Sequence, residues 1–259
     1  MNFNFVLHKI YAQAVKDKGF ADKKAEYYQT WQVCELETLN PNDENPDAKW
    51  ARQGYSLLGS PGGGAFFLKE QERTINDPII SFDLPNLAEG ESRMYRLDMH
   101  FWESDGNSAK VREVFHDETL DILVQSFNAN GGDLEKAGND VKDWLNNEGK
   151  GVLDKTLEIA HVGANPLVGL GMKVLPLFAK LTKLAIETAK KDDYMGRHRF
   201  IMDYQSSGPG TYRWRIFPIG GGHELPEFMT EEGTMKSEVF LADNSNANRM
   251  DVNYEATIF

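Results

Sequence analysis

Hydrophobic and polar residues alternate along the first hundred residues of the chain, which is the pattern of β-strands with one buried face. The alternation is clearest over residues 3–7 and 95–101. Clusters of Asn, Asp, Gly and Pro at 40–46, 60–64 and 76–78 separate the apolar runs and predict turns. This part of the chain is therefore expected to consist mainly of strands.

The pattern changes to a helical period between about 108 and 190. Apolar residues recur three and four positions apart over 111–127, and a second helical stripe follows the glycine pair at 131–132. A third stripe lies around 152–160. The step Asn165-Pro166 is typical of the start of a fourth helix, because Asn caps helices and Pro is favoured at the first helical position.

Alternation returns over 198–216, and two last runs, 238–241 and 252–259, predict a C-terminal β-hairpin. The strands before the helical segment and those after it are each too few to close a hydrophobic core alone. Both groups are therefore expected to contribute to a single core. The predicted fold class is α+β, an antiparallel β-sandwich with a helical insertion. Its expected boundaries are 1–105 and 192–259 for the sandwich and 106–191 for the inserted helical subdomain.

The strands resemble those of a known family. The sequence Leu-Asp-Met-His-Phe-Trp-Glu-Ser-Asp over 97–105 resembles the C2-domain pattern in which a strand ends in an aromatic-acid-x-Asp loop. Asp-Asp-Tyr-Met-Gly over 192–196 is similar to the acidic step that follows in that family, and 6–14, 22–28 and 76–85 resemble its earlier strands. The resemblance implies a C2-like sandwich whose third loop is enlarged into the helical insertion.

The resemblance also implies a cation site where these loops meet. Calcium prefers six to eight oxygen ligands from carboxylates and carbonyls, so calcium is the cofactor to expect. The chain departs from the family at 26 and 103, where Glu replaces Asp, and at Tyr27, where the family has Pro. The alternative is that these acids face water separately. The candidate ligands are Asp22, Glu26, Glu103, Asp105 and Asp193.

Composition narrows the possible partners. The chain has 259 residues, of which 41% are hydrophobic, and this content is typical of a globular protein. Its net charge of −12 disfavours a nucleic-acid partner. A single cysteine, Cys34, excludes an internal disulfide, and it is expected to pack as a small apolar residue. No signal peptide or transmembrane run is recognisable, so we expect a soluble protein that is cytoplasmic in its producer or exported by a non-classical route.

The stretch 166–190 combines a broad apolar arc with lysines on the opposite side, and Pro176 is expected to kink it. A helix of this kind suits a membrane interface, with acyl chains on one side and anionic headgroups on the other. The alternative is a core helix whose apolar arc is covered by the other helices. The two interpretations are compatible, because a helix that is buried at rest can be released at a membrane. The candidate membrane residues are Leu170, Lys173, Val174, Leu177, Phe178, Lys180, Leu181 and Lys183.

Catalytic motifs do not stand out. The six histidines are scattered, no nucleotide-binding or nucleophile-elbow motif occurs, and His100 is expected at the surface. Three function classes stay open. The preferred one is a peripheral, inducible membrane-engaging protein, such as a toxin or effector, that favours anionic lipid. The second is an interaction or structural protein whose helices dock a protein partner, and the third is an enzyme of unrecognised type. The oligomeric state is left open.

Overall fold

The computed structural model of the chain describes most of the strands and helices but leaves several connections out. For some strand residues, including Glu26 and Asp193, it describes the backbone alone. The third predicted helix, 152–160, lies outside the described residues. The described ranges are 1–14, 24–37, 47–57, 66–68, 71–104, 108–147, 167–189, 192–218, 229–230, 233–242 and 249–258.

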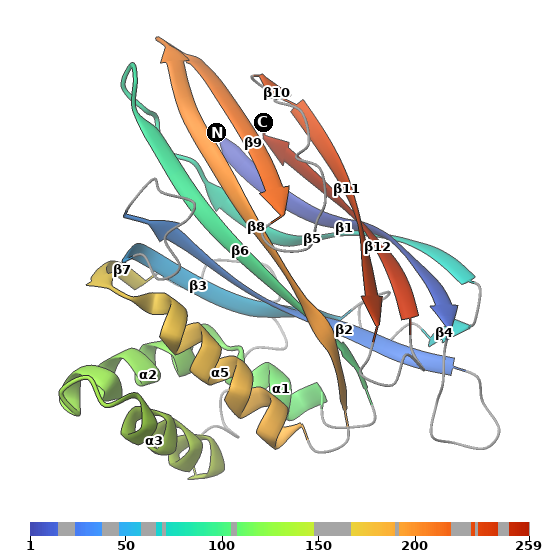
Figure 1. Cartoon of the computed structure of the whole chain (residues 1–259), viewed down its shortest axis with the longest axis vertical. Coiled ribbons are helices and arrows are strands. Elements are labelled where there is room, and N and C mark those ends of the chain that lie inside the picture. Colours follow the sequence, from blue (N-terminus) through green and yellow to red (C-terminus); the bar gives the residue numbers. More distant parts are fainter. Residues whose placement is uncertain are drawn as a thin grey trace.

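Two antiparallel sheets form the framework (Figure 1). The smaller has four strands in the order β11-β12-β1-β5, and its β11–β12 pair confirms the predicted C-terminal hairpin. The larger has the order β10-β9-β8-β6-β2-β3-β7, with β4 paired to β2. The smaller sheet comprises β1 (Asn2–Ala14), β5 (Gln71–Asp83), β11 (Gly233–Ala242) and β12 (Arg249–Ile258). The larger comprises β2 (Lys24–Leu36), β3 (Ala48–Leu57), β4 (Phe66–Leu68), β6 (Ser92–Glu103), β7 (Leu167–Met172), β8 (Asp193–Gly208), β9 (Thr211–Pro218) and β10 (Met229–Thr230).

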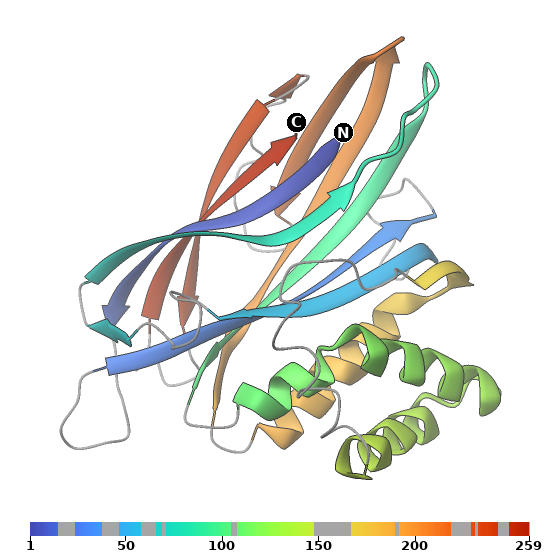
Figure 2. The same cartoon turned by 180° about the vertical axis from the view of Figure 1, so that it is seen from behind.

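The described helices form a third layer, called the helix layer below. It lies on the face of the larger sheet that is turned away from the smaller sheet (Figures 1 and 2). We call that face of the larger sheet its outer face. The helices lie beside β7, β3 and β2, while β9 and the upper ends of β6 and β8 project beyond them. The helix layer comprises α1 (Ser108–Val114), α2 (Asp117–Ala129), α3 (Leu134–Asn147) and α5 (Val174–Thr188).

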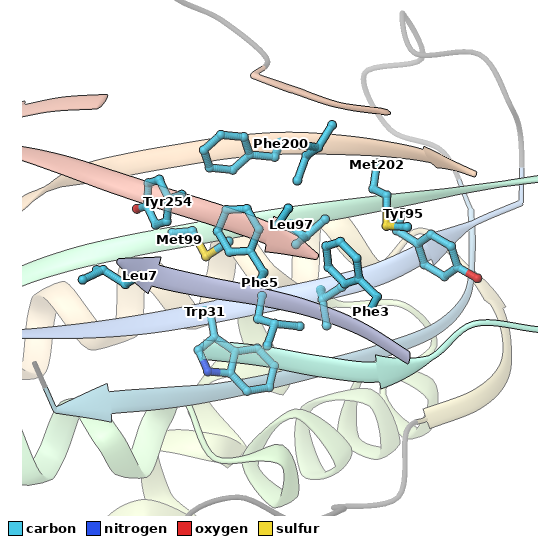
Figure 3. Close-up of a cluster of buried hydrophobic side chains, with 14 of the residues drawn as sticks. Phe3, Phe5, Leu7, Trp31, Tyr95, Leu97, Met99, Phe200, Met202 and Tyr254 are labelled. Atoms are coloured by element: carbon cyan, nitrogen blue, oxygen red, sulfur yellow. The ribbon is translucent and has the colours of Figure 1, made fainter. Parts of the chain in front are cut away.

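An aromatic-rich core joins the two sheets (Figure 3). The predicted alternation of β1 is confirmed, since Phe3, Phe5 and Leu7 are at most 1% exposed. Phe5 stacks on Tyr254 of β12 with ring centroids 4.9 Å apart. From the larger sheet, Leu97 and its neighbours on the same face of β6 belong to the same core. This inter-sheet core holds no helix residues among its described members.

A second core lies between the helix layer and the outer face. It contains apolar side chains from all four described helices together with Tyr28, Cys34, Trp102 and Ile201 of the larger sheet. Cys34 is fully buried, as expected of a small packed residue. The larger sheet is therefore covered on both faces, on one side by strands and on the other by helices.

The α2–α3 connection follows the predicted glycine break. Gly131 and Gly132 both have positive φ, and the Gly132 N–H donates to the Phe127 carbonyl at 2.9 Å, which ends α2. The Asp133 carboxylate then accepts from the Lys136 N–H at 3.0 Å and caps α3. Local sequence chemistry thus sets this helix hairpin.

The predicted start of the last helix was wrong. Residues 167–172 form β7, which pairs with β3, and the helix begins only at Val174. Because Pro176 lies in the first turn, where backbone N–H groups have no helical acceptor, it does not kink the helix as we expected. Leu170, a candidate membrane residue, consequently belongs to a strand.

The predicted turn at 76–78 was also wrong, because these residues lie within β5. The pairing of β5 with β1 shifts register on either side of Asp77 and Pro78. β5 is an edge strand of the smaller sheet, where a proline without an N–H is tolerated. The Asn-Asp-Pro sequence produces irregular pairing here rather than a chain reversal.

Candidate functional site beneath and beside the helix layer

The apolar candidates for membrane contact on α5 are buried in this structure. Val174 and Leu181 are fully buried, Leu177 is 1% exposed and Phe178 is 3% exposed. All four belong to the core beneath the helix layer. Among the described residues, the large apolar side chains exposed to solvent are Met1 and Ile186, and Ile186 lies on α5. The apolar arc therefore faces the sheet.

The three lysine candidates differ in their surroundings. Lys173 is exposed just before α5, and Lys183 keeps 64% of its side chain exposed, 4.0 Å from Glu187. Lys180 instead keeps only 12% exposed and donates to Glu135 of α3 at 2.7 Å. That ion pair lowers the pKa of the Glu135 carboxyl. Lys180 thus links two helices, whereas Lys173 and Lys183 are open to a partner.

A chain of buried hydrogen bonds crosses the outer face beneath the helices. The Gln53 side-chain amide of β3 donates to the backbone carbonyls of Val114 and His116, at 3.0 and 2.7 Å. Its oxygen accepts from the Gln32 amide at 3.2 Å. The Gln32 oxygen is left to accept from His100 Nε2 at 3.3 Å. These polar groups connect the sheet to the α1–α2 connection.

His100 completes this chain and was wrongly expected at the surface. It is 1% exposed because its face of β6 is covered, and its ring lies 5.5 Å from that of Phe115, which directly follows α1. The hydrogen bonds place the proton on Nε2, so Nδ1 accepts from the Tyr194 hydroxyl at 3.1 Å. Burial, together with the positive charges of Arg197 and Arg199, lowers the pKa of His100 to about 3. The imidazole is therefore neutral near pH 7.

Asp117 is a second titratable group at this interface, and its side chain is 13% exposed. The first residue of α2, it accepts from the Gln53 backbone N–H at 2.6 Å and lies 4.0 Å from Arg52. Burial raises the pKa of its carboxyl to about 6, although the hydrogen bond and Arg52 act in the opposite direction. Both contacts of Asp117 reach from the helix layer to β3.

Part of the proposed cation site can be located. Glu103 ends β6, and its backbone pairs with Tyr27 of β2 and Asp193 of β8, so these strand ends lie side by side. Glu103 is 3% exposed. Asp22 and Asp105 lie outside the described residues, as do the side chains of Glu26 and Asp193. Within the part of the chain that the structure describes, no three His, Cys, Asp or Glu side chains are grouped as metal ligands.

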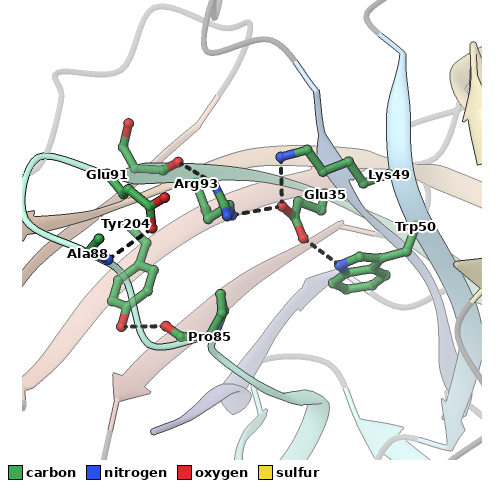
Figure 4. Close-up of polar contacts among 9 residues, drawn as sticks. Glu35, Lys49, Trp50, Pro85, Ala88, Glu91, Arg93 and Tyr204 are labelled. Carbon is green, nitrogen blue, oxygen red and sulfur yellow. Dashed lines mark hydrogen bonds and ion pairs between the residues drawn. The ribbon is translucent and has the colours of Figure 1, made fainter. Parts of the chain in front are cut away.

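A separate polar cluster lies around Glu35 of β2 (Figure 4). Its carboxylate accepts from Trp50 Nε1 at 2.8 Å and contacts Lys49 Nζ at 3.3 Å and Arg93 Nε at 3.2 Å. The cluster joins β2, β3 and β6. Because three donors satisfy one carboxylate that is 7% exposed, we interpret the cluster as structural.

Sequence reasoning missed a row of arginines on the outer face, beside the helix layer. Met202, Trp214 and Ile216 point into the inter-sheet core, so the alternate residues of β8 and β9 lie on the outer face. The signal was present as two Arg-x-Arg steps, 197–199 and 213–215, but only the strand register shows that they share a face. We call this surface the arginine face; its charged members are Arg96, Asp98, Arg197, Arg199, Asp203, Arg213 and Arg215.

Comparison with known proteins adds no assignment: no protein-family model, curated protein or solved structure matches this chain. Among the described helices, none has the length and apolar character needed to cross a bilayer. The functional argument therefore rests on the residues themselves.

Proposed function

We propose that the protein is a non-enzymatic, inducible membrane-engaging protein, whose helix layer leaves the sandwich and presents the apolar face of α5 to an anionic bilayer. The observation that carries this proposal is the division of the interior into two cores. Among the described residues, the inter-sheet core contains none from a helix, whereas every buried apolar residue of α5 belongs to the other core. Release of the helices would leave the aromatic inter-sheet core in place.

The sheet surface beneath the helices is mixed. Water can satisfy its polar groups once the helices have left, and these are Thr30, Gln32, Gln53 and His100. Its apolar side chains, which include Tyr28, Trp102 and Ile201, would become exposed and oppose release. The helices contribute mainly apolar side chains. Burying the seven apolar residues of α5 contributes roughly 10–20 kcal/mol, as much as a whole domain's net stability. Release therefore needs both a trigger and a lipid environment that takes up the same apolar face.

Acid is the trigger that the interface supports. A proton on His100 would place a charge beneath the helices, close to Arg197 and Arg199, and positive charges repel one another there. The net charge of −12 would also fall as carboxylates are protonated, which weakens repulsion from an anionic membrane. The proposed pH dependence thus rests on the buried His100 ring, whereas the membrane contact itself rests on the apolar face of α5.

The exposed lysines of α5 provide a test. Lys173→Gln with Lys183→Gln should weaken binding to anionic vesicles at pH 4.5 by about tenfold or more, since each lysine near such a surface contributes about 1 kcal/mol. Lys136→Gln with Lys142→Gln, two exposed positions on α3, is the matched control. Vesicle co-sedimentation and dye leakage measure the two effects.

Lys180 should stay unchanged in this experiment, because its ion pair with Glu135 is structural. Equal binding by the α5 variant and the α3 control would remove α5 as the membrane element. No association with neutral or anionic vesicles at either pH 7.5 or pH 4.5 would favour the second function, a protein that docks a protein partner.

The C2-like identity and the calcium site belong to the same proposal. What supports them is that the motif-bearing ends of β2, β6 and β8 are neighbours, and that the helical segment follows β6 as an enlarged third loop would. The residues proposed to hold calcium are Asp22, Glu26, Glu103, Asp105 and Asp193, and the ion would neutralise their mutual repulsion.

Calcium should then stabilise the folded chain. At a calcium concentration of 100 times the dissociation constant, the free energy of unfolding should rise by about 2.7 kcal/mol. Thermal melts in calcium and in chelator measure the shift, and Glu103→Gln with Asp105→Asn should remove it. Identical melts in calcium and chelator at neutral pH would exclude the site.

A further inference from the structure

The arginine face carries a charge opposite to that of the whole protein. It holds five arginines and two aspartates, a local excess of three positive charges on a chain of net charge −12. It extends away from the helix layer, since β9 and the upper part of β8 project beyond the helices (Figure 1). A partner could therefore reach it while the helices stay in place.

The two aspartates orient the arginines around them. Asp98, 4% exposed, contacts Arg96 at 3.4 Å and Arg199 at 3.2 Å. Asp203, 6% exposed, contacts Arg215 Nε at 3.0 Å. Guanidinium groups held in this way lose little rotational freedom when a carboxylate binds, and their planar forks suit bidentate contacts.

Two arginines of the face keep their charge available. Arg197 and Arg213 are exposed and make no ion pair with the residues that the structure describes. Arg197 pairs in register with His100, and Arg213 pairs with Gln205 eight residues further along β8. At about 3.3 Å per residue the two positions are about 26 Å apart along the strands. One small anion cannot span this distance, whereas about eight residues of extended polypeptide can.

We propose that the arginine face binds an acidic, extended polypeptide segment of a protein partner. Charge screening favours this partner over a membrane. At physiological salt the Debye length is about 8 Å, so a narrow segment lying on the face senses mainly the local positive charge. A bilayer faces a much larger part of the protein surface, which is negatively charged overall, so an anionic bilayer is repelled more strongly than a narrow segment. The aromatic side chains of Tyr212 and Trp214 pack toward the inter-sheet core, so they offer no stacking platform for nucleic-acid bases.

The experiment uses the full chain and a fluorescein-labelled peptide of ten glutamates, with a ten-glutamine peptide as the neutral probe. Fluorescence anisotropy at pH 7.5 and low salt should show binding of the glutamate peptide alone. Arg197→Gln with Arg213→Gln should weaken that binding by about tenfold. Lys136→Gln with Lys142→Gln removes the same charge from α3 and should leave the affinity within about twofold.

Two further measurements keep the test decisive. Arg197→Lys with Arg213→Lys retains the positive charges but lacks the planar guanidinium groups, so this variant should bind the glutamate peptide with intermediate affinity. It also replaces the glutamine variant in the comparison if the glutamine variant folds poorly. Anionic vesicles and a single-stranded oligonucleotide serve as competing partners. An equal loss of affinity in the arginine and α3 variants would overturn the proposal. So would tighter, Arg197- and Arg213-dependent binding of either competing partner.

Discussion

Replacement of Leu181 by aspartate is expected to lower the free energy of unfolding by about 4–5 kcal/mol. Leu181 is fully buried in the core beneath the helix layer, so the change leaves a cavity and places a carboxylate among apolar side chains. An effect of this size is a large fraction of a typical domain's stability. Urea unfolding followed by circular dichroism measures it.

Ile186 is the matched control on the same helix, because it is 45% exposed. Ile186→Asp should change the free energy of unfolding by less than about 1 kcal/mol. If the sandwich and the helix layer are separable, Leu181→Asp should also lose helical signal before the fluorescence of Trp214, which lies in the inter-sheet core, changes. Equal destabilisation by the two aspartates would contradict the packing of α5 described above.

The second large effect is a loss of stability in acid through His100. Its folded-state pKa, about 3, lies below the ordinary value of 6.5, so the unfolded chain binds the proton more readily. The contribution of His100 is therefore complete above pH 6.5 and is lost as the pH falls from 6.5 toward 3. At 1.36 kcal/mol per pKa unit, the loss amounts to roughly 4–5 kcal/mol.

Asp117 opposes this effect over part of the same range. Its folded-state pKa, about 6, lies above the ordinary 3.8, so the cost of its buried charge disappears as the pH falls from 6 to 3.8. His116 and Asp121, also near the start of α2, have their pKa values lowered and raised, respectively, chiefly by burial. The His100 contribution must therefore be isolated by mutation.

His100→Gln isolates it, because glutamine retains hydrogen-bonding groups but does not titrate. The free energy of unfolding of His100→Gln should fall less between pH 6.5 and 4 than that of the parent. The free energy of unfolding of Asp117→Asn should fall more steeply than that of the parent over the same range. Chemical unfolding at several pH values checks both slopes. Parallel curves for the parent and His100→Gln would show that the ring is not the acid-sensitive group.

Period-two patterns predicted the strands well and their surroundings poorly. Alternation in β6 correctly placed Leu97 and Met99 on one face and His100 on the other, but the pattern does not say whether the second face meets water. The helix layer, which comes later in the chain, covers it. A polar residue on a strand was therefore interpreted as a surface residue, although its hydrogen bonds are made to Gln32 and Tyr194.

Short segments with mixed signals caused the other errors. Leu-Val-Gly-Leu-Gly-Met over 167–172 fits either a helix or a strand by hydrophobicity, and pairing with β3 decides the outcome. The arginine face was missed for a related reason. Its members come from three strands, and only the register of β6, β8 and β9 brings Asp98 to Arg199 and Asp203 to Arg215.

The position of β1 has a consequence for biosynthesis. β1 is an inner strand of the smaller sheet and pairs with β12, which is translated some 240 residues later. At 5–20 residues per second, the ribosome needs on the order of 10–50 s to reach β12. Until then Phe3, Phe5 and Leu7 lack one of their two neighbouring strands. Nascent chains should therefore depend on chaperones, and truncation within β12 should yield aggregated rather than partly folded protein.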